Sequence, residues 1–172
     1  MGYWCAGIGA CIANDRRDTL VITGDGSLQM NLQEFAPIQH NRLPIKTIVL
    51  NNNGYLLIRS TQRNFMEDRF LGESPETGVW CPPLDKIADA YGIPYFRINE
   101  PTEIDSIIPK VLETPGPVIC EVMTPEWQPL IPRITSERTP EGKLVPHEYS
   151  DMFPFLDREE YIMNMIAEVE EV

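Results

Sequence analysis

The stretch "TIVLNNNGYLLI", residues 47–58, decides how this chain folds. Two apolar runs flank three asparagines and Gly54, and an Asn-Gly pair between apolar runs is a strong signal for a two-residue β-hairpin. The alternative is that a strand ends at the asparagines and a helix begins after them, so that the asparagine amides hold a ligand. The segments on either side of this stretch decide between the two.

Strand-like and helix-like segments alternate along the chain. Apolar, β-branched runs typical of buried parallel strands occupy residues 18–24, 45–50, 93–98 and 116–123. Helical periodicity is expected over residues 1–13, 27–41, 84–92, 101–113 and 156–172. Segments rich in turn residues, the first of them partly helical, cover residues 59–83 and 124–155. The alternation predicts an α/β fold, a parallel sheet with helices on both faces, in one domain over residues 1–172.

Charge and cysteine usage exclude several classes of partner and site. Twenty-six acidic against fourteen basic residues give a net charge of −12, which argues against binding to nucleic acid or an anionic membrane. The four cysteines show no C-x-x-C spacing, so a thiolate metal site is not expected. Scattered cysteines without an export signal indicate buried thiols in a reducing cytoplasm. The apolar opening of the chain is too short to span a bilayer.

Polar motifs follow the first two expected strands, "GDGS" after the first and "NNNG" after the second. Since carboxyl ends of neighbouring parallel strands converge at one edge of a sheet, Asp25 and Asn52 are expected to meet there. A carboxylate, an amide carbonyl and a backbone carbonyl are the hard oxygen ligands that Mg²⁺ prefers. The amides of Gly26 and Ser27, at a helix start, are placed to hold a phosphate.

These motifs carry a resemblance to a known family. The sequence "GDGSLQMNLQEFAPIQHNRLPIKTIVLNNNGY" resembles the diphosphate-binding domain of thiamine-diphosphate-dependent enzymes, in particular the acetolactate synthase-like family. Asp25 and Asn52 are 27 positions apart, which fits the spacing of that family, and the similarity continues through "KIADAYGIPYFRI" and "GPVICEV". The resemblance favours a strand end followed by a helix over the hairpin.

The resemblance also implies a set of binding residues. Thiamine diphosphate and Mg²⁺ would be the cofactors, with the metal bound by Asp25, the side chain of Asn52 and the carbonyl of Gly54. The residues implied to contact the cofactor are Gly24, Asp25, Gly26, Ser27, Asn52, Gly54 and Tyr55.

Enzymes of this family need a second, pyrimidine-binding domain, and nothing in this sequence resembles it. The N-terminal part of the diphosphate-binding domain is also expected to be missing, because the chain enters an apolar helix at once. The sequence therefore predicts half an active site, inactive without a pyrimidine-binding domain in the same chain or in a separate subunit. By the same resemblance, the protein is expected to form a homodimer or tetramer.

Ile58 gives a hint about the reaction. In pyruvate decarboxylases a glutamate near the substrate lies four positions beyond the glycine whose carbonyl binds the metal, and acetolactate synthases are apolar there. Counted from Gly54, this chain has Ile58, expected to face the substrate. An apolar residue favours an enzyme that decarboxylates a 2-keto acid and transfers the acyl unit to a carbonyl acceptor. The alternatives are the diphosphate-binding subunit of a split, sulfopyruvate-type 2-keto acid decarboxylase and a non-catalytic cofactor-binding assembly module.

Other candidate residues have simpler interpretations. Asn31 with Glu34 resembles a capping box, which favours a helix-capping role for Glu34 over acid-base catalysis. Arg59, Arg63 and Arg69 could meet an anionic substrate, but the composition around them favours a solvated loop.

Overall fold

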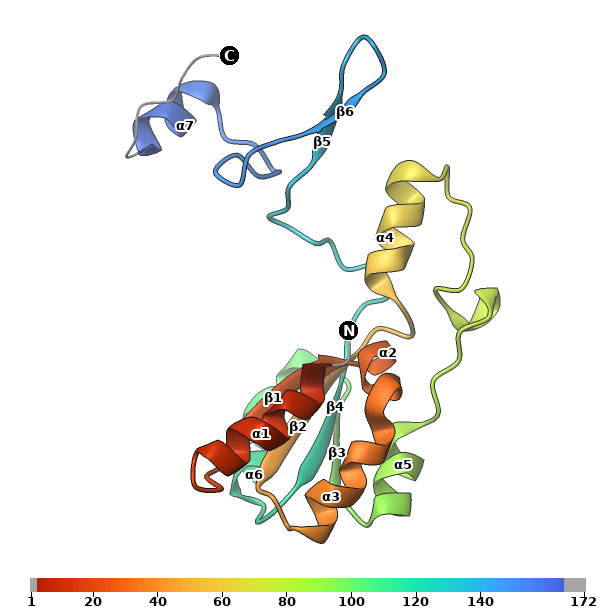
Figure 1. The fold of residues 1–172 in the computed structure, drawn as a ribbon, viewed down its shortest axis with the longest axis vertical. Coiled ribbons are helices and arrows are strands. Elements are labelled where there is room, and N and C mark those ends of the chain that lie inside the picture. Colours follow the sequence, from red (N-terminus) through yellow and green to blue (C-terminus); the bar gives the residue numbers. More distant parts are fainter. Residues whose placement is uncertain (1–2, 166–172) are drawn as a thin grey trace. The chain divides into compact units, whose positions relative to one another are not determined.

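Four parallel strands form the central sheet of this chain (Figure 1). The structure, a computed structural model, describes residues 3–165. The strand order is β1-β2-β4-β3, and each pairing between neighbours is parallel. The strands are β1 (Thr19–Gly24), β2 (Ile45–Asn51), β3 (Tyr95–Ile98) and β4 (Val118–Met123). All four coincide closely with the strands expected from the sequence.

The chain divides into two compact units, residues 1–128 and residues 129–172. The first unit contains the parallel sheet and the helices that pack against it. The second contains a two-stranded antiparallel hairpin and one short helix. The division concerns compactness alone, and the assignment of residues 1–172 to one domain stays a prediction.

Helices of the first unit connect the strands. They are α1 (Ala6–Ala13), α2 (Asp25–Leu28), α3 (Phe35–His40), α4 (Leu56–Phe65), α5 (Leu84–Tyr91) and α6 (Ile104–Glu113). Short 3-10 turns, named η1 to η4 in chain order, occupy Tyr3–Cys5, Gln29–Glu34, Pro75–Thr77 and Pro101–Glu103. The α5 helix ends at Gly92 in the left-handed conformation, as its glycine stop predicted.

The single helix expected over residues 27–41 is interrupted. It forms α2, η2 and α3 in succession, because Asn31 leaves the helical region with φ −142° and ψ 37°. The capping box expected from Asn31 and Glu34 is therefore wrong. Glu34 does stand at the N-cap of α3, but its side chain makes no capping hydrogen bond.

Both faces of the sheet are covered by helices, as the α/β pattern predicted. On one face, side chains of β2 such as Ile45 and Val49 join a cluster with residues of α1, α3 and α5. On the other face, Ile48 packs with Val111 of α6 in a smaller cluster. The alternation of β2 residues between the two clusters follows from the two-residue period of a strand.

The β1 strand is less buried than its composition predicted. Val21 is in the core, but Leu20 and Ile22 on the opposite side are 55% and 63% exposed. The reason is position, since β1 is an edge strand and α6, on that face, packs against β3 at the far edge. The pattern of residues alone did not show which strand lies at the edge.

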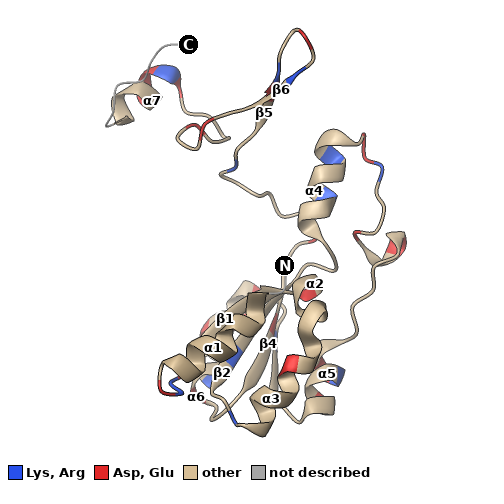
Figure 2. Ribbon diagram, in the orientation of Figure 1, with Lys and Arg blue, Asp and Glu red and all other residues tan. Residues whose placement is uncertain are grey.

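Charged residues are rare within the four strands and number three, Lys46, Arg97 and Glu121. Most of the sheet is accordingly tan in Figure 2. Lys46 is buried, and its Nζ donates hydrogen bonds to the carbonyl of Gly116, over 2.7 Å, and to that of Thr114. Thr114 is the C-cap of α6. Lys46 therefore ties the end of α6 to the sheet.

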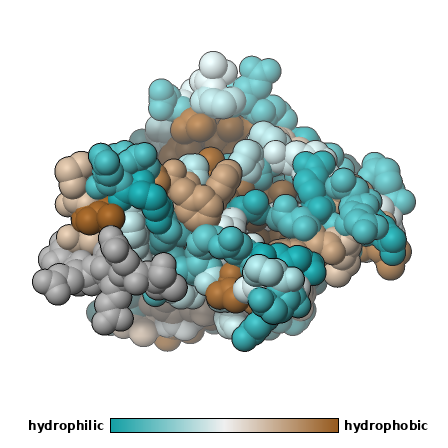
Figure 3. All heavy atoms as spheres, turned by 90° about the horizontal axis from the view of Figure 1, so that it is seen from above, coloured by the Kyte–Doolittle hydropathy of each residue, from teal (hydrophilic) through white to brown (hydrophobic). Residues whose placement is uncertain are grey.

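The second unit is built from β5 (Ser136–Arg138), β6 (Leu144–Pro146) and α7 (Arg158–Asn164). The helix expected over residues 156–172 is thus present in its first part, and residues 166–172 lie outside the described residues. Of the helices in residues 3–165, none is both long and apolar enough to cross a membrane. On the face shown in Figure 3, hydrophobic residues are interspersed with hydrophilic ones.

Candidate functional site

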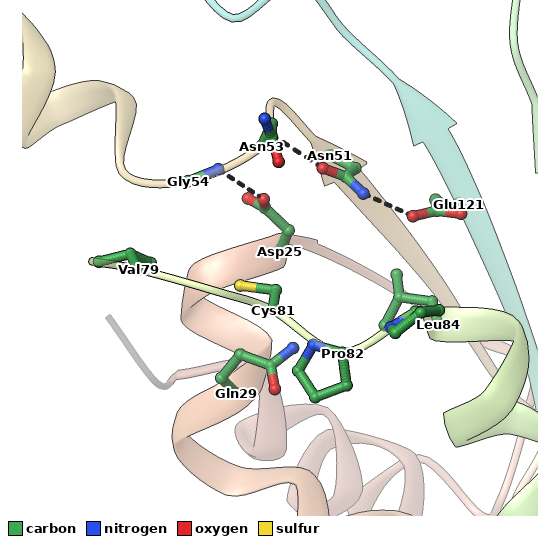
Figure 4. A pocket seen from close by; sticks show the side chains of 11 residues that line it. Asp25, Gln29, Asn51, Asn53, Gly54, Val79, Cys81, Pro82, Leu84 and Glu121 are labelled. Carbon is green, nitrogen blue, oxygen red and sulfur yellow. Dashed lines mark hydrogen bonds between the residues drawn. The ribbon is translucent and has the colours of Figure 1, made fainter. Parts of the chain in front are cut away.

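The carboxyl ends of β1 and β2 lie side by side and bring the two polar motifs together. Because β2 pairs in parallel with β1 on one side and with β4 on the other, a hairpin at the asparagines is excluded. The register aligns Gly24, the last residue of β1, with Leu50 of β2. Asp25 therefore meets the turn that follows β2, as the sequence predicted (Figure 4).

A small cavity of about 90 Å³ opens at this edge of the sheet. Its lining comes from α2 and η2, from the end of β2 and the turn after it, from β4, and from the start of α5 and the segment that leads into it (Figure 4). The polar residues of the lining are Asp25, Gln29, Asn51, Asn53, Cys81 and Glu121. Burial and the charge of Asp25 raise the pKa of the Cys81 thiol, which keeps this residue protonated and uncharged.

Asp25 is the first residue of α2 and only 3% exposed. Its Oδ2 accepts a hydrogen bond from the amide of Gly54 over 2.9 Å. Burial raises the pKa of the Asp25 carboxyl, while backbone hydrogen bonds, that of Gly54 foremost and that of Asn52 among them, act to lower it. Since a buried carboxylate is costly unless other groups balance its charge, this position suits a cation.

The side-chain oxygen of Asn52, Oδ1, is buried and accepts no hydrogen bond from any residue that the structure describes. An unpaired buried acceptor costs about 1–3 kcal/mol, a cost that a bound cation or a water molecule would remove. Gln29 Nε2 is likewise buried and without a partner among residues 3–165, and Gln29 lines the cavity. Besides the carboxylate of Asp25, this edge of the sheet thus offers an oxygen suited to a metal ion, that of Asn52, which is not in the lining of the cavity, and a donor suited to an anion, that of Gln29.

The turn after β2 requires a glycine at position 54. Gly54 has φ +138°, a backbone conformation that other residues rarely adopt. A Cβ at this position would lie 2.0 Å from the carbonyl oxygen of Glu73, and the next amide, of Tyr55, donates to that same oxygen over 2.8 Å. The segment around Glu73 therefore packs directly against the turn that is expected to bind the metal.

The remaining residues predicted to contact the cofactor surround the same strand ends. Gly24 is the N-cap of α2, and Gly26 and Ser27 lie in its first turn. A Cβ on Gly26 would lie 2.2 Å from Cε1 of Tyr55, so these two residues are in direct contact. The structure therefore brings the predicted binding residues together at one edge of the sheet, while their contacts with a cofactor stay a prediction.

Ile58 occupies the first turn of α4 and is 45% exposed. It does not belong to the lining of the cavity at Asp25. Its exposure shows that it is not a core residue of this chain. That Ile58 faces the substrate stays a prediction.

Glu121 is a buried acid of β4 that the sequence reasoning did not select. Its Oε1 accepts a hydrogen bond from Asn51 Nδ2 over 2.6 Å, and its Oε2 accepts one from the hydroxyl of Tyr95. Arg97 Nε lies 3.7 Å from Oε2. Burial and the bond to Glu121 raise the pKa of the Tyr95 phenol, which therefore stays a hydrogen-bond donor. An acid inside the otherwise apolar run "GPVICEVM" was the available signal.

Arg59 corrects the interpretation of its segment as a solvated loop. It lies in α4, is only 2% exposed and pairs with Glu73, whose side chain is 5% exposed. Burial alone would raise the pKa of the Glu73 carboxyl, but hydrogen bonds from Arg59 and its neighbours outweigh that effect and hold the pKa below its usual value. Arg63 and Arg69 are exposed, as expected. No local pattern marks Arg59, since its partner is 14 residues away.

Comparison with known proteins adds independent information about this site. The family model described as "Thiamine pyrophosphate enzyme, C-terminal TPP binding domain" matches residues 1–122. The matched range lies within the first unit of the structure and includes both motifs at the strand ends.

Curated relatives agree with the family match. The chain is 34% identical over 135 residues to "Acetolactate synthase 2, chloroplastic" of Zea mays, which covers 76% of this chain and 21% of the relative. It is 32% identical over 135 residues to "Acetolactate synthase large subunit" of Porphyra purpurea, covering 78% of this chain and 22% of the relative. The acetolactate synthase large subunit of Cyanidium caldarium is 37% identical over 129 residues, which cover 73% of this chain and 22% of the relative. The chain thus spans about a fifth of the length of these relatives.

Proposed function

Because this chain belongs to the thiamine pyrophosphate enzyme family, through its C-terminal TPP binding domain, we propose that its paired strand ends bind Mg²⁺ and the diphosphate of thiamine diphosphate. One observation carries the proposal. The unpaired, buried oxygen of Asn52 belongs to the same turn whose amides donate to the buried carboxylate of Asp25. A divalent cation would satisfy both oxygens at once.

The proposed metal ligands are Asp25, the side-chain oxygen of Asn52 and the carbonyl of Gly54. This set of oxygens has the chemistry that Mg²⁺ prefers, with room for water and phosphate oxygens in the remaining positions. Within residues 3–165 no three His, Cys, Asp or Glu side chains cluster as a metal site, which is compatible with a set that holds one carboxylate. The metal would offset part of the negative charge of Asp25 and of the diphosphate.

The diphosphate is proposed to lie against the first turn of α2, with contacts to Gly24, Gly26 and Ser27, and with Tyr55 beside them. Gln29 Nε2 is a buried donor without a partner among the described residues, and a phosphate oxygen would satisfy it. Thiamine diphosphate, when bound, supplies the carbon nucleophile and the electron sink for cleavage next to a carbonyl. The residues of this chain would anchor that group and hold its charged end.

For the whole protein we propose an acetolactate synthase-like reaction, in which a 2-keto acid is decarboxylated and its acyl unit is transferred to a carbonyl acceptor. The similarity to acetolactate synthases and the apolar Ile58 support this proposal. A split, sulfopyruvate-type 2-keto acid decarboxylase and a non-catalytic cofactor-binding assembly module are the alternatives.

The proposed partner is a pyrimidine-binding domain, in the same chain or in a separate subunit, within a homodimer or tetramer. This chain alone is then expected to turn over no 2-keto acid, and robust turnover by the purified 172-residue chain would contradict the proposal. The free thiols of Cys11, Cys81 and Cys120 support a location in the reducing cytoplasm.

Electron paramagnetic resonance with Mn²⁺ in place of Mg²⁺ tests the site, because bound and free Mn²⁺ give distinct signals. With thiamine diphosphate present, the wild-type chain is expected to bind Mn²⁺, and Asp25→Asn is expected to abolish binding. Asp89→Asn, an exposed aspartate of α5, is the matched control and should leave the affinity unchanged.

The variant Asn52→Ala tests whether Asn52 is a metal ligand or a residue that supports the fold. Removing an oxygen that is unpaired in the apo chain should leave the melting temperature unchanged or raise it, while the Mn²⁺ affinity falls. Unchanged Mn²⁺ affinity in both Asp25→Asn and Asn52→Ala would refute the assignment of this edge as the metal site.

A further inference from the structure

A buried arginine holds the turn that carries the proposed metal ligands. We propose that Arg59, together with its partner Glu73, is a positioning residue that fixes the backbone of residues 52–54 in the conformation required for metal binding. The inference rests on the proposed function, since it concerns the same site. It assigns to Arg59 a role that neither its sequence context nor the family match indicates.

The guanidinium of Arg59 reaches the backbone of the turn directly. Its Nη2 donates to the carbonyl of Asn53 over 3.2 Å, and its Nη1 lies 3.5 Å from the carbonyl of Asn52. Its Nη1 also donates to the carbonyl of Glu126, in the segment after β4. One planar side chain thereby joins the turn after β2 to the segment that follows the neighbouring strand.

Glu73 adds further hydrogen bonds that hold the same turn. Its carboxylate accepts the Nε hydrogen of Arg59, and its carbonyl accepts hydrogen bonds from the amide of Tyr55, over 2.8 Å, and from Arg59 Nη2, over 3.4 Å. The short turn after Glu73 is itself held by a capping box between Ser74 and Thr77. Gly54 therefore lies between the carbonyl of Glu73, which other hydrogen bonds hold in place, and the carboxylate of Asp25.

The charges of this pair have a consequence for a metal. A buried, unpaired guanidinium beside the metal turn would repel Mg²⁺ strongly, because charges interact over long distances in a medium of low dielectric constant. Glu73 neutralises that charge within the pair, so Arg59 can supply hydrogen bonds to the carbonyls of the turn without opposing the cation. Arginine suits this role better than lysine because its fixed, planar fork addresses several acceptors at once.

The same helix offers a matched control. Arg63 lies one turn further along α4 and, like Arg59, faces the ring of Trp127, with distances from Cζ to the ring centroid of 3.6 Å and 5.2 Å respectively. Arg63 is half exposed and pairs with Asp68, outside the turn. Its replacement removes a similar stacking contact and the same charge, but none of the hydrogen bonds to the turn.

The experiment compares Arg59→Lys, Arg59→Met/Glu73→Gln and Arg63→Met in the full chain. The double variant removes both charges, so a change in affinity reports on position rather than on net charge. Mn²⁺ binding is measured by electron paramagnetic resonance in the presence of thiamine diphosphate, at a temperature where circular dichroism shows each variant folded. Hydrogen exchange at the amides of Asn53 and Gly54 is measured without metal or cofactor.

We expect the double variant to bind Mn²⁺ about 10–100-fold more weakly, the range typical of outer-shell residues at metal sites. Arg59→Lys should weaken binding less, and Arg63→Met should leave it unchanged. Exchange at Gly54 should accelerate in both Arg59 variants, because the turn is then less constrained. Arg59→Lys keeps a test available if the double variant does not fold.

Two results would overturn the inference. The first is wild-type Mn²⁺ affinity in the folded Arg59 variants while Asp25→Asn abolishes binding, which would leave the proposed function intact and reduce Arg59 to a stability role. The second is slow, wild-type exchange at Gly54 in these variants. If instead the wild-type chain binds no Mn²⁺, the proposed function fails, and the role of Arg59 fails with it.

Discussion

The carboxylate of Glu121 accepts a hydrogen bond from the side-chain amide of Asn51 over 2.6 Å, although 70 residues separate the two in the sequence. The oxygen of the same amide, Asn51 Oδ1, accepts a hydrogen bond from the backbone of Asn53 over 2.9 Å. Glu121 thus orients Asn51, and Asn51 orients the turn. The turn is therefore supported from β4 by Glu121 and from α4 by Arg59.

Glu121→Gln is expected to destabilise the chain. Glutamine offers one acceptor oxygen where the carboxylate serves both Asn51 and Tyr95, so at least one charge-assisted hydrogen bond is lost. Such bonds contribute about 1.5–3 kcal/mol each, which sets the expected fall in the free energy of unfolding, measured by urea denaturation. Glu113→Gln, at an exposed position of α6, is the control. Equal unfolding midpoints for the two variants would contradict the role assigned to Glu121.

Gly54→Ala is expected to be more damaging than Gly78→Ala. Both glycines have positive φ, of 138° and 109°, so alanine introduces backbone strain of about 1–3 kcal/mol at either position. Only at Gly54 would the added Cβ also collide with a backbone oxygen, that of Glu73, whereas at Gly78 it meets nothing within 4 Å. Urea denaturation of both variants measures the difference. If the free energy of unfolding fell no more in Gly54→Ala than in Gly78→Ala, the segment at Glu73 would be shown to move aside easily.

Most of the fold follows from local sequence patterns. The convergence of the two polar motifs at the strand ends follows from them as well. The apolar runs and the turn residues predict the strands and helices, and the rule that parallel strand ends converge predicts the meeting of Asp25 with Asn52. Those inferences need only information within a few residues of each motif. In the structure Asp25 accepts a hydrogen bond from the amide of Gly54, in the turn that also contains Asn52.

The rest of the site depends on contacts between distant segments, which leave no periodic trace. Arg59 and Glu73 both lie in a charged, turn-rich stretch, and nothing in it indicates that they bury each other. The exposure of Leu20 and Ile22 likewise depends on the position of β1 at the sheet edge. Glu121 differs, because a lone acid in an apolar strand indicates a buried polar network and could have been selected.

The buried Lys46 predicts a dependence of stability on pH. Burial lowers the pKa of its ammonium in the folded chain below the ordinary value of 10.5, although Asp18, 4.0 Å away, opposes the shift. Between the lowered value and 10.5 the unfolded chain binds more protons than the folded chain, so this group makes the free energy of unfolding rise with pH in that window.

Urea denaturation at a series of alkaline pH values isolates this contribution by difference. Relative to the wild type, Lys46→Met should lack the rise, whereas Lys110→Met, which removes an exposed lysine of α6, should keep it. If the free energy of unfolding depended on pH in the same way in the wild type and in Lys46→Met, burial would not shift the pKa of this lysine.

The last prediction concerns Ile58 and the type of reaction. If Ile58 faces the substrate, its apolar side chain keeps proton donors away from the carbanion-like carbon that follows decarboxylation. A carboxylic acid at this position would supply a general acid, a role typically worth about 10²–10⁴ in rate for the step it serves. Together with a pyrimidine-binding domain, Ile58→Glu should therefore shift the product from the ligated hydroxyketone toward free aldehyde, as measured by chromatography.

The exposure of Ile58 means that a change in product ratio can be measured without a large loss of stability. Ile58 is 45% exposed, so glutamate is not buried there, and the cost in stability should stay within about 0.5 kcal/mol, as is usual at the surface. Leu57→Glu, the neighbouring residue at 66% exposure, adds the same charge one position away, pointing about 100° around the helix, and should leave the product ratio unchanged. A folded, active Ile58→Glu variant with the wild-type ratio of aldehyde to hydroxyketone would remove the reason to prefer acyl transfer over simple decarboxylation.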